Sequence, residues 1–321
     1  MAVTLALAGD TMLGRLVADR LAADPGLELL GPEIRAAVAR ADVFVANLEC
    51  CISERGERFP DPRKPFYFRA PPVAAERLAA LGVDCVTLAN NHALDYGPVA
   101  LLDTLDHLDA AGIAHAGAGP DRKTARAPAV LDTAGGARLR VVAASDHPAA
   151  YAAADGRPGI AYADLRGDGV PEWLRAAAGP GPDDDLVLVS PHWGPNMRAE
   201  PVAHVRAAAA ELLAAGATLV AGHSAHVFQG VAGRVLFDLG ELVDDYAVDR
   251  HLRNDLGLLW LVTLDERGPV RLEALPLGLG IGHTRAAQGE DAAWVLGRFA
   301  ALCRVLGTEV TVREGRAVVE W

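Results

Sequence analysis

Side chains able to bind metal ions follow short apolar runs at several points of this chain. Asp10 comes shortly after Val3–Ala8, for example, and His192 comes shortly after Leu186–Ser190. The residues placed in this way are Asp10, Glu49, Asn91, His92, His192, His223 and His226. A short apolar run is typical of a buried strand, and open α/β sheets bind ligands at the carboxyl ends of their strands. The recurrence therefore predicts an enzyme site at the end of a sheet.

This set offers both oxygen and nitrogen ligands, because it combines carboxylates, an amide oxygen and imidazoles. Such a mixture suits Mn, Zn or Fe better than Mg or Ca, which prefer oxygen ligands. The set could hold two divalent ions with Glu49 bridging them. Two ions roughly 3.5–4 Å apart acidify a bridging water and clamp the group under attack. The chemistry we expect is hydrolysis at phosphorus or at an acyl carbon.

Several of these residues also have structural explanations. Asp10 could cap the helix that follows it, and Asp95 could cap the helix that begins shortly after it. His92 could be a capping residue as well, and the last two histidines of the set could be loop residues bonded to the backbone. Of Asn90 and Asn91 one is expected to be a turn former, and we favour Asn90 for that role. The repetition of the pattern favours metal binding for the rest.

Strand-like runs alternate with helical ones, which predicts an α/β fold with a parallel or mixed sheet and helices on its outer faces. The predicted helices are Leu13–Ala23, Pro32–Arg40, Val73–Leu81, Pro98–Ala111, Pro171–Ala178, Pro201–Ala215 and Asp291–Leu306. The predicted strands are Val3–Ala8, Val43–Ala46, Asp84–Leu88, Ile113–His115, Ala129–Asp132, Leu139–Ala144, Leu186–Ser190, Thr218–Ala221, Phe228–Val231, Arg234–Asp238, Leu256–Leu264, Val270–Pro276, Glu309–Arg313 and Ala317–Glu320. We predict one domain over residues 1–321, built of two packed sheets and completed by the strands and helix of 256–321. The segment 145–169 is expected to be irregular, and 265–268 to be a hairpin loop.

The composition narrows the possible function classes. The chain has 321 residues, 51% of them hydrophobic, which is enough for a sizeable core. Its net charge of −12 argues against nucleic-acid binding, which needs a basic face, but bound divalent ions could still attract an anionic substrate. The four cysteines form no disulfide framework, which fits a reducing compartment. No basic leader or membrane-length apolar stretch occurs, so we predict a cytoplasmic protein that does not enter the membrane.

Six short segments together resemble the motif series of a known family. In order along the chain they read GDTMLGR from Gly9, ANLE from Ala46, ANNHALDYG from Ala89, HWG from His192, GHSAHVFQ from Gly222 and LFDLGELV from Leu236. The series is similar to that of the poly-γ-glutamate capsule synthesis proteins of the CapA type, a branch of the calcineurin-like metallophosphoesterase superfamily. The resemblance covers residues 9–243, about three quarters of the chain.

The resemblance implies a four-layer α/β/β/α sandwich of the metallophosphoesterase type, with one or two divalent ions at the strand ends. It implies that Asp10 and His226 hold one ion, that Glu49 bridges, and that His92 is a general acid oriented by Asp95. The second ion would be held by Asn91, His192 and His223.

Three positions depart from the pattern of these relatives. Met12 stands where the first superfamily motif, D-x-H, has its histidine, so one metal position is a ligand short. Glu49 stands where the superfamily has aspartate. Asn196 stands where the family often has an acidic residue.

Arg15, Lys64 and Arg69 are the predicted contacts for substrate carboxylates or phosphates, since arginine grips such groups bidentately. The alternative is that they belong to a solvated charged loop. A group of acids either lines the rim of the pocket or forms an acidic surface loop: Asp238, Glu241, Asp244 and Asp245. Five histidines have no partner in the motif series and are expected to be surface or structural residues: His107, His115, His147, His204 and His251.

The leading functional hypothesis is a metal-dependent hydrolase that uses a metal-activated water on an amide-linked γ-glutamyl or peptide-like acidic substrate, small or polymeric. Two alternatives remain open. One is a phosphomonoesterase or phosphodiesterase, and the other is a non-catalytic accessory protein of poly-γ-glutamate-type synthesis. The sequence does not define the substrate, the metal or the oligomeric state.

Overall fold

Two large β-sheets pack face to face in the computed structural model, which describes residues 2–133, 135–181, 185–266 and 268–321. The first sheet has the strand order β19-β20-β17-β16-β1-β2-β5-β6, with β15 beside β1 and β18 beside β17. Its strands are β1 Val3–Thr11, β2 Val43–Leu48, β5 Cys85–Thr87, β6 Ala114–Ala116, β15 Glu241–Val243, β16 Leu256–Asp265, β17 Gly268–Gly280, β18 His283–Ala286, β19 Thr311–Arg313 and β20 Arg316–Glu320. The C-terminal strands thus lie beside the N-terminal strand in one sheet.

The second sheet has the order β13-β14-β12-β11-β9-β8. Its strands are β8 Ala129–Asp132, β9 Arg138–Ser145, β11 Leu186–His192, β12 Leu219–Ala221, β13 Val231–Ala232 and β14 Val235–Leu236. Two short pairs stand apart from both large sheets, namely β3 Cys51–Ile52 with β4 Arg69–Ala70, and β7 Ala118–Gly119 with β10 Gly159–Ile160. The strand β3 precedes a proline-rich stretch at residues 54–72, and β4 lies within it. The strand β10 follows a short 3₁₀ turn at Ala149–Tyr151 in the segment expected to be irregular.

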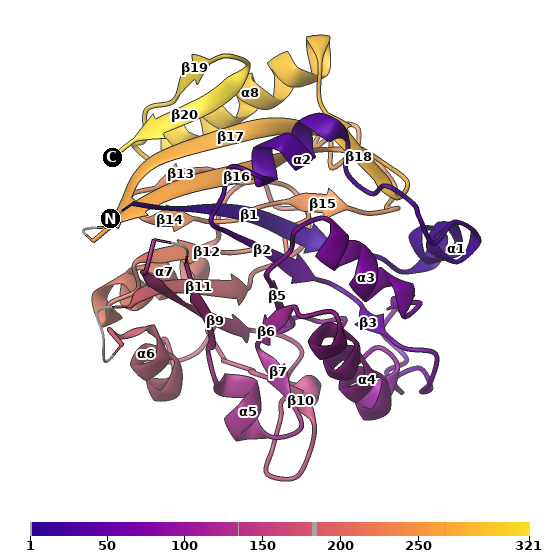
Figure 1. Cartoon of the computed structure of the whole chain (residues 1–321). Coiled ribbons are helices and arrows are strands. Elements are labelled where there is room, and N and C mark those ends of the chain that lie inside the picture. Colours follow the sequence, from indigo (N-terminus) through magenta and orange to yellow (C-terminus); the bar gives the residue numbers. More distant parts are fainter. Residues whose placement is uncertain (1, 134, 182–184, 267) are drawn as a thin grey trace.

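Helices cover the outer face of each sheet, as Figure 1 shows. One apolar core joins the first sheet to α1–α4, and another joins the second sheet to α6 and α7. A third core lies between the two sheets and includes the buried residues of α8, Val295, Phe299 and Cys303. The helices are α1 Arg15–Ala23, α2 Pro32–Val38, α3 Val73–Ala80, α4 Gly97–Ala110, α5 Arg122–Arg126, α6 Glu172–Ala178, α7 Ala203–Ala215 and α8 Gly289–Val305. The layers therefore follow the order α/β/β/α, which confirms the expected fold class.

The strand β1 illustrates why these residues form the centre of the fold. Successive side chains of a strand point to opposite faces. Leu5 and Leu7 face the core between the sheets, whereas Ala6 and Ala8 face the helices. A strand buried on both faces is largely apolar, and this explains the mostly apolar run Val3–Ala8 at the start of the sequence.

The sequence-based predictions of the elements are confirmed for the helices and for most strands, and they are less accurate for some short elements. All seven predicted helices are present, with ends that agree within two residues. The predicted strands Phe228–Val231 and Arg234–Asp238 shrink to the two-residue strands β13 and β14. The elements β15, β18 and α5 are absent from the predictions. Part of the predicted 265–268 loop, residue 267, lies outside the described residues.

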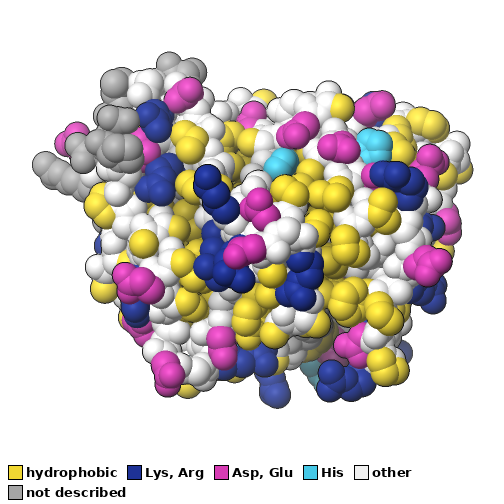
Figure 2. Space-filling view, turned by 90° about the horizontal axis from the view of Figure 1, so that it is seen from below, with side chains coloured by type: hydrophobic (Ala, Val, Ile, Leu, Met, Phe, Trp, Pro, Cys, Tyr) yellow, Lys and Arg dark blue, Asp and Glu magenta, His cyan; other side chains and the backbone are white. Residues whose placement is uncertain are grey.

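The charge on one face of the molecule and the character of the helices bear on the expectation that the chain binds neither nucleic acid nor membrane. Figure 2 shows the lower face of Figure 1, where acidic and basic side chains are interspersed with hydrophobic ones; the described residues of this face form no continuous basic area. Across the described ranges, no helix has both the length and the apolar character that crossing a membrane requires.

The carboxyl end of β1 is irregular in a way that bears on the site. The pairing of β1 with β2 shifts register between Ala8 and Asp10, and its pairing with β15 shifts after Asp10. Such bulges redirect side chains and are common beside active sites. At Gly9 the backbone of β1 meets the segment before β15 so closely that a Cβ would lie 1.9 Å from the carbonyl oxygen of Gly240. Glycine is required here because any side chain would push the two segments apart.

We therefore expect Gly9→Ala to lower the free energy of unfolding by about 2–3 kcal/mol, as other overpacked core positions do. Gly278→Ala is the matched control, because Gly278 lies in β17 of the same sheet and an added Cβ would meet nothing within 4 Å. Urea unfolding of the two variants and the parent measures the difference. Equal midpoints for both variants would contradict the close approach of Gly9 to Gly240.

Candidate metal centre

Parallel strands of both sheets end at one place in the molecule. In the first sheet β1, β2 and β5 run parallel, and in the second β9, β11 and β12 do. Asp10 lies near the end of β1 and Glu49 directly after β2. His192 ends β11, and a single bridge pairs it with His223, which follows β12. The sheets thus bring together residues that are far apart in the sequence.

One group of possible ligands consists of Asp10, His192 and His223, whose ligand atoms all lie within 4.8 Å of one another. The Nδ1 atoms of the two imidazoles are 2.8 Å apart, and Nδ1 of His223 is 3.7 Å from Oδ1 of Asp10. Burial lowers the pKa of His192 well below its usual value and that of His223 to about 4. Both rings are therefore neutral near pH 7, the form in which imidazole binds metals.

A second group consists of Asp10, His226 and Glu241, again with ligand atoms within 4.8 Å of one another. Nδ1 of His226 is 3.1 Å from Oδ2 of Asp10 and 2.6 Å from Oε1 of Glu241. Glu49 completes the surroundings, with its Oε2 3.9 Å from the same nitrogen. Asp10 belongs to both groups and presents one oxygen to each. By position it is thus the shared residue, whereas the sequence suggested Glu49 for bridging.

Several polar atoms of this cluster are buried without hydrogen-bond partners. They are Oδ2 of Asp10, both carboxylate oxygens of Glu49 and Glu241, Nδ1 of His226 and Oδ1 of Asn91. A buried polar atom without a partner costs about 1–3 kcal/mol, and more if it is charged. So many at one point, with donor types that suit Mn, Zn or Fe, fit a site whose missing partner is a cation.

The ionisation of the cluster leads to the same conclusion. Burial raises the pKa of Glu49 well above its usual range, and the charge of Asp10 raises it further. Burial also raises the pKa of Glu241, against the attraction of His226. Burial alone would lower the pKa of His226, but Glu49 and Glu241 outweigh it and hold that pKa well above its usual value. The carboxylates exceed the positive charge available to them, and a divalent ion would balance them.

His92 lies beside this cluster and is held by Asp95. Nδ1 of His92 is 2.6 Å from Oδ2 of Asp95, its ring stacks on Phe68 at 4.0 Å between centroids, and its Nε2 is 3.8 Å from Oε1 of Glu49. Asp95 also forms an ion pair with Nζ of Lys64 at 2.9 Å and accepts a hydrogen bond from the Tyr151 hydroxyl at 3.2 Å. Burial lowers the pKa of His92 to about 4, although Asp95 opposes this. The ring is thus neutral and fixed, with Nε2 on the side of the cluster.

The structure rejects the capping alternatives for the two aspartates. Asp10 lies within β1, and α1 has Gly14 at its N-cap without a side-chain hydrogen bond. The N-cap of α4 is Tyr96, also without such a bond, and Asp95 instead accepts from the Phe68 amide at 2.6 Å.

Asn90 has the structural role that we favoured for it. Its amide nitrogen donates to Oδ1 of Asn47 and to the carbonyl of Leu48, and its Oδ1 accepts from the His92 amide. Oδ1 of Asn91 has no such partner, which keeps Asn91 as the candidate ligand of the two.

The turn that carries His223 and His226 has an unusual backbone. Ser224 has a φ of 114° and His226 a φ of 59°. Non-glycine residues with positive φ are uncommon and gather at functional sites. Asp238 supports this turn, because its carboxylate accepts from the amides of Ala225 at 2.8 Å and Gly240 at 2.9 Å. One buried side chain thus links the histidine turn to the segment leading into β15.

A cavity of about 560 Å³ opens beside the cluster. His92 and His226 line it on the side of the centre, and Phe66, Phe68 and Tyr246 form aromatic walls. Its other lining residues are Arg15, Asn196, Met197, Asp245, Ala247 and Asn254. The volume suits a small molecule or a short stretch of a chain.

Of the three predicted substrate cations, Arg15 alone lines this cavity. Its guanidinium pairs with the buried Asp245 and lies 5.2 Å from the Phe68 ring centroid. Nζ of Lys64 donates to the Asn91 carbonyl at 2.7 Å and contacts Asp95. Arg69 lies 4.1 Å above the Tyr96 ring. Lys64 and Arg69 thus have protein partners, and their role toward a substrate stays a prediction.

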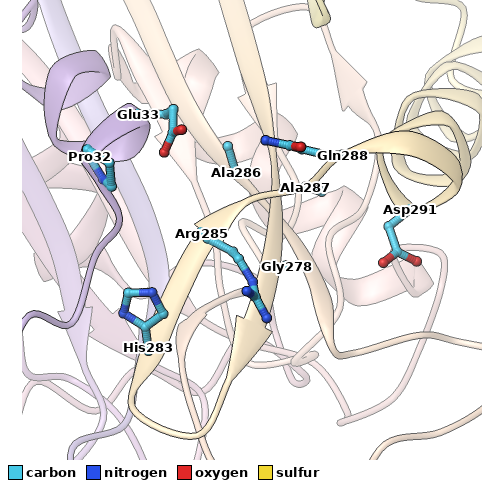
Figure 3. A pocket seen from close by; sticks show the side chains of 9 residues that line it. All are labelled: Pro32, Glu33, Gly278, His283, Arg285, Ala286, Ala287, Gln288 and Asp291. Carbon is cyan, nitrogen blue, oxygen red and sulfur yellow. The ribbon is translucent and has the colours of Figure 1, made fainter.

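A second cavity of about 540 Å³ lies elsewhere, between the starts of α2 and α8 and the strand β18. Figure 3 shows Glu33, His283, Arg285, Gln288 and Asp291 around it. None of its lining side chains has a buried polar atom without a partner. The cavity beside the carboxylate and histidine cluster is therefore the candidate functional site.

Comparison with known proteins agrees with the motif series. Residues 4–246 match the family model described as bacterial capsule synthesis protein PGA_cap. The chain belongs to this family. It is 34% identical over 294 residues to a probable polyglutamine synthesis accessory protein of Mycobacterium tuberculosis, covering 85% of this chain and 75% of the relative.

Two further relatives are each 26% identical. They are the capsule biosynthesis protein CapA of Bacillus anthracis, over 88% of this chain and 69% of the relative, and the PGA biosynthesis protein CapA of Bacillus subtilis, over 84% and 70%. Among solved structures, TT1561 of Thermus thermophilus is similar with a TM-score of 0.36 and 11% identity, over 83% of this chain and 100% of that one. A likeness at this level supports no conclusion.

Sequence reasoning missed part of the surroundings of the centre in this PGA_cap protein. Asp238, Glu241 and Asp244 are buried, so an acidic surface loop is the wrong description of this segment. His147, expected to be superficial or structural, has its ring 5.1 Å from that of His192, and its Nδ1 bonds Asp146. The signal for Glu241 was its place in the last motif, directly after Gly240.

We expect elemental analysis to find divalent ions bound to the chain when it is purified without chelator. We expect His223→Ala to lower the metal content, because the group with Asp10 and His192 loses an imidazole.

Restoring ions to the chelated parent at 100 times their dissociation constant should stabilise it by about 2.7 kcal/mol, which is measured as a rise in melting temperature. His251→Ala, at an exposed position, should bind like the parent. A parent without metal and without a melting shift would refute the centre.

Proposed function

We propose that this chain is a metal-dependent hydrolase that cleaves an amide-linked, γ-glutamyl or peptide-like acidic substrate. The observation that carries the proposal is the convergence of buried ligand atoms without partners at the side of a cavity that also exposes a fixed imidazole. The names of the relatives, which refer to polyglutamine and PGA synthesis, support substrates of this class.

The residues that would hold the ions are Asp10, Glu49, Asn91, His192, His223 and His226. Divalent ions bound there would supply Lewis acidity, which activates water and stabilises negative charge that develops on the attacked group. The surrounding protein excludes bulk water, since Asp10, Glu49 and His223 are completely buried. Electrostatic interactions are stronger in such surroundings than in water.

His92 and Asp95 would manage the proton. The carboxylate of Asp95 accepts from Nδ1 of His92, which leaves the lone pair on Nε2 directed toward the centre. Nε2 can then take a proton and return it to the leaving amine, while Asp95 stabilises the charged ring. Lys64, Tyr151 and the Phe68 amide fix Asp95 in turn, so that the imidazole keeps one orientation.

Arg15 would bind a carboxylate of the substrate in the cavity. The N–H groups on Nε and Nη2 of Arg15 donate hydrogen bonds to Asp245. Those on Nη1 have no hydrogen-bond partner within the described part of the chain, and the side chain is 31% exposed. The aromatic walls would contact the aliphatic part of the substrate. A segment of an acidic amide-linked chain has both features.

We expect His92→Ala and Asp95→Asn to lower kcat of the metal-loaded protein by about 10²–10⁴, with little change in metal content. The assay follows release of amine from γ-glutamyl amides, and chelator should abolish it. His251→Ala should turn over like the parent because its side chain is exposed and away from the cavity.

The same assay separates the alternatives. Cleavage of nitrophenyl phosphates without cleavage of γ-glutamyl amides would make the chain a phosphoesterase. An ion-loaded parent that cleaves neither would support the accessory role that the name of the mycobacterial relative states for that protein. Turnover by His92→Ala at the parental rate would refute the proton-transfer role.

A further inference from the structure

Glu241 lies beside Asp10 because of the pairing between β15 and β1. The two strands run parallel, and their register sets Asp10 against Glu241. Glu241 is 1% exposed, and neither of its carboxylate oxygens has a hydrogen-bond partner. A buried carboxylate in this state needs compensation by a positive charge or by protonation.

The contacts of Glu241 have the form of ligands arranged around a common point. Its Oε1 is 2.6 Å from Nδ1 of His226, and that nitrogen is 3.1 Å from Oδ2 of Asp10. Despite these short distances, none of the three atoms has the geometry of a hydrogen bond. Ligands at about 2.1 Å from a shared ion and at right angles to each other lie about 3 Å apart. The three atoms therefore fit one coordination sphere.

Met12, two residues after Asp10 on the same segment, provides no ligand to this position. Its side chain is fully buried in the core between the first sheet and its helices. The sulfur is 3.0 Å from the Gly14 amide, from which it accepts a weak hydrogen bond. The ligand that Met12 cannot supply would therefore come from another segment.

We propose that Glu241 is that ligand, and that it makes the Asp10–His226 position selective for an ion that prefers oxygen, such as Mn²⁺. The inference rests on the proposed metal centre and extends it. The carboxylates of Asp10, Glu49 and Glu241 surround this position, and His226 is its single imidazole. The other position has two imidazoles, those of His192 and His223. Carboxylates suit Mn²⁺, and imidazole suits Zn²⁺. The two positions thus differ in the ions they favour.

The test is titration of the full, chelator-treated chain with Mn²⁺ alone and with Zn²⁺ alone, followed by calorimetry and by the electron paramagnetic resonance of free Mn²⁺. Glu241→Gln keeps the shape of the side chain and removes its charge. We expect this variant to lose at least about 100-fold in Mn²⁺ affinity at one position, since even groups that only support ligands cost 10–100-fold. Zn²⁺ binding at the other position should stay close to that of the parent.

Asp244→Asn is the matched control for the general effect of negative charge. Asp244 lies three residues further on, is buried, and belongs to neither group of ligand atoms. Its replacement should leave Mn²⁺ affinity close to that of the parent. An equal loss of affinity in both variants would mean that Glu241 acts only through the field, and would overturn its assignment as a ligand.

A purely structural role for Glu241 predicts a different pattern. If Glu241 only pairs with His226, Glu241→Gln lowers the melting temperature of the metal-free protein and leaves Mn²⁺ affinity unchanged. That result, with two ions still bound by the parent, would overturn this inference alone. A parent that binds no ion would overturn the proposed function and this inference together.

Discussion

The burial of three carboxylates around one imidazole is the constraint on which the rest of the site depends. Asp10, Glu49 and Glu241 are each at most 1% exposed, and His226 is the imidazole that they share. Like charges repel strongly in such surroundings, so the fold holds together a cluster that would separate by itself. Three features serve this purpose: the bulge after Ala8, the left-handed backbone at His226, and the two hydrogen bonds that backbone amides donate to the Asp238 carboxylate. They hold these candidate ligands in the arrangement that the proposed metal centre requires.

The two sheets contribute different chemistry to the centre. The first sheet delivers the carboxylates, from β1, from the residue after β2 and from β15. The second delivers the imidazoles, from the end of β11 and from the turn after β12. The centre lies where the ends of the two sheets meet, and Asp10 contributes one oxygen to each side. In the proposed centre, the side supplied by the first sheet is therefore rich in oxygen and the side supplied by the second sheet is rich in nitrogen.

Sequence reasoning succeeded where the signal was local. The apolar run before Asp10 and the periodicity of α4 each lie in one segment, and both predictions were confirmed. Glu241 was missed because β15 has three residues and exists only through pairing with β1, more than 200 positions earlier. The partner of Arg15 was missed for the same reason, since Asp245 is 230 positions away. Non-local pairing of short elements leaves no periodic trace in the sequence.

The charges around the cavity limit how an acidic substrate could be recognised. Arg15 pairs with Asp245, and Lys64 pairs with Asp95, so both of these cations are already balanced by a buried carboxylate. A polyanion would meet little net positive charge from these side chains. In the proposed function the bound ions must therefore supply most of the attraction for the substrate as well as its activation. Binding and catalysis then depend on the same charges, and removal of the ions would weaken both together.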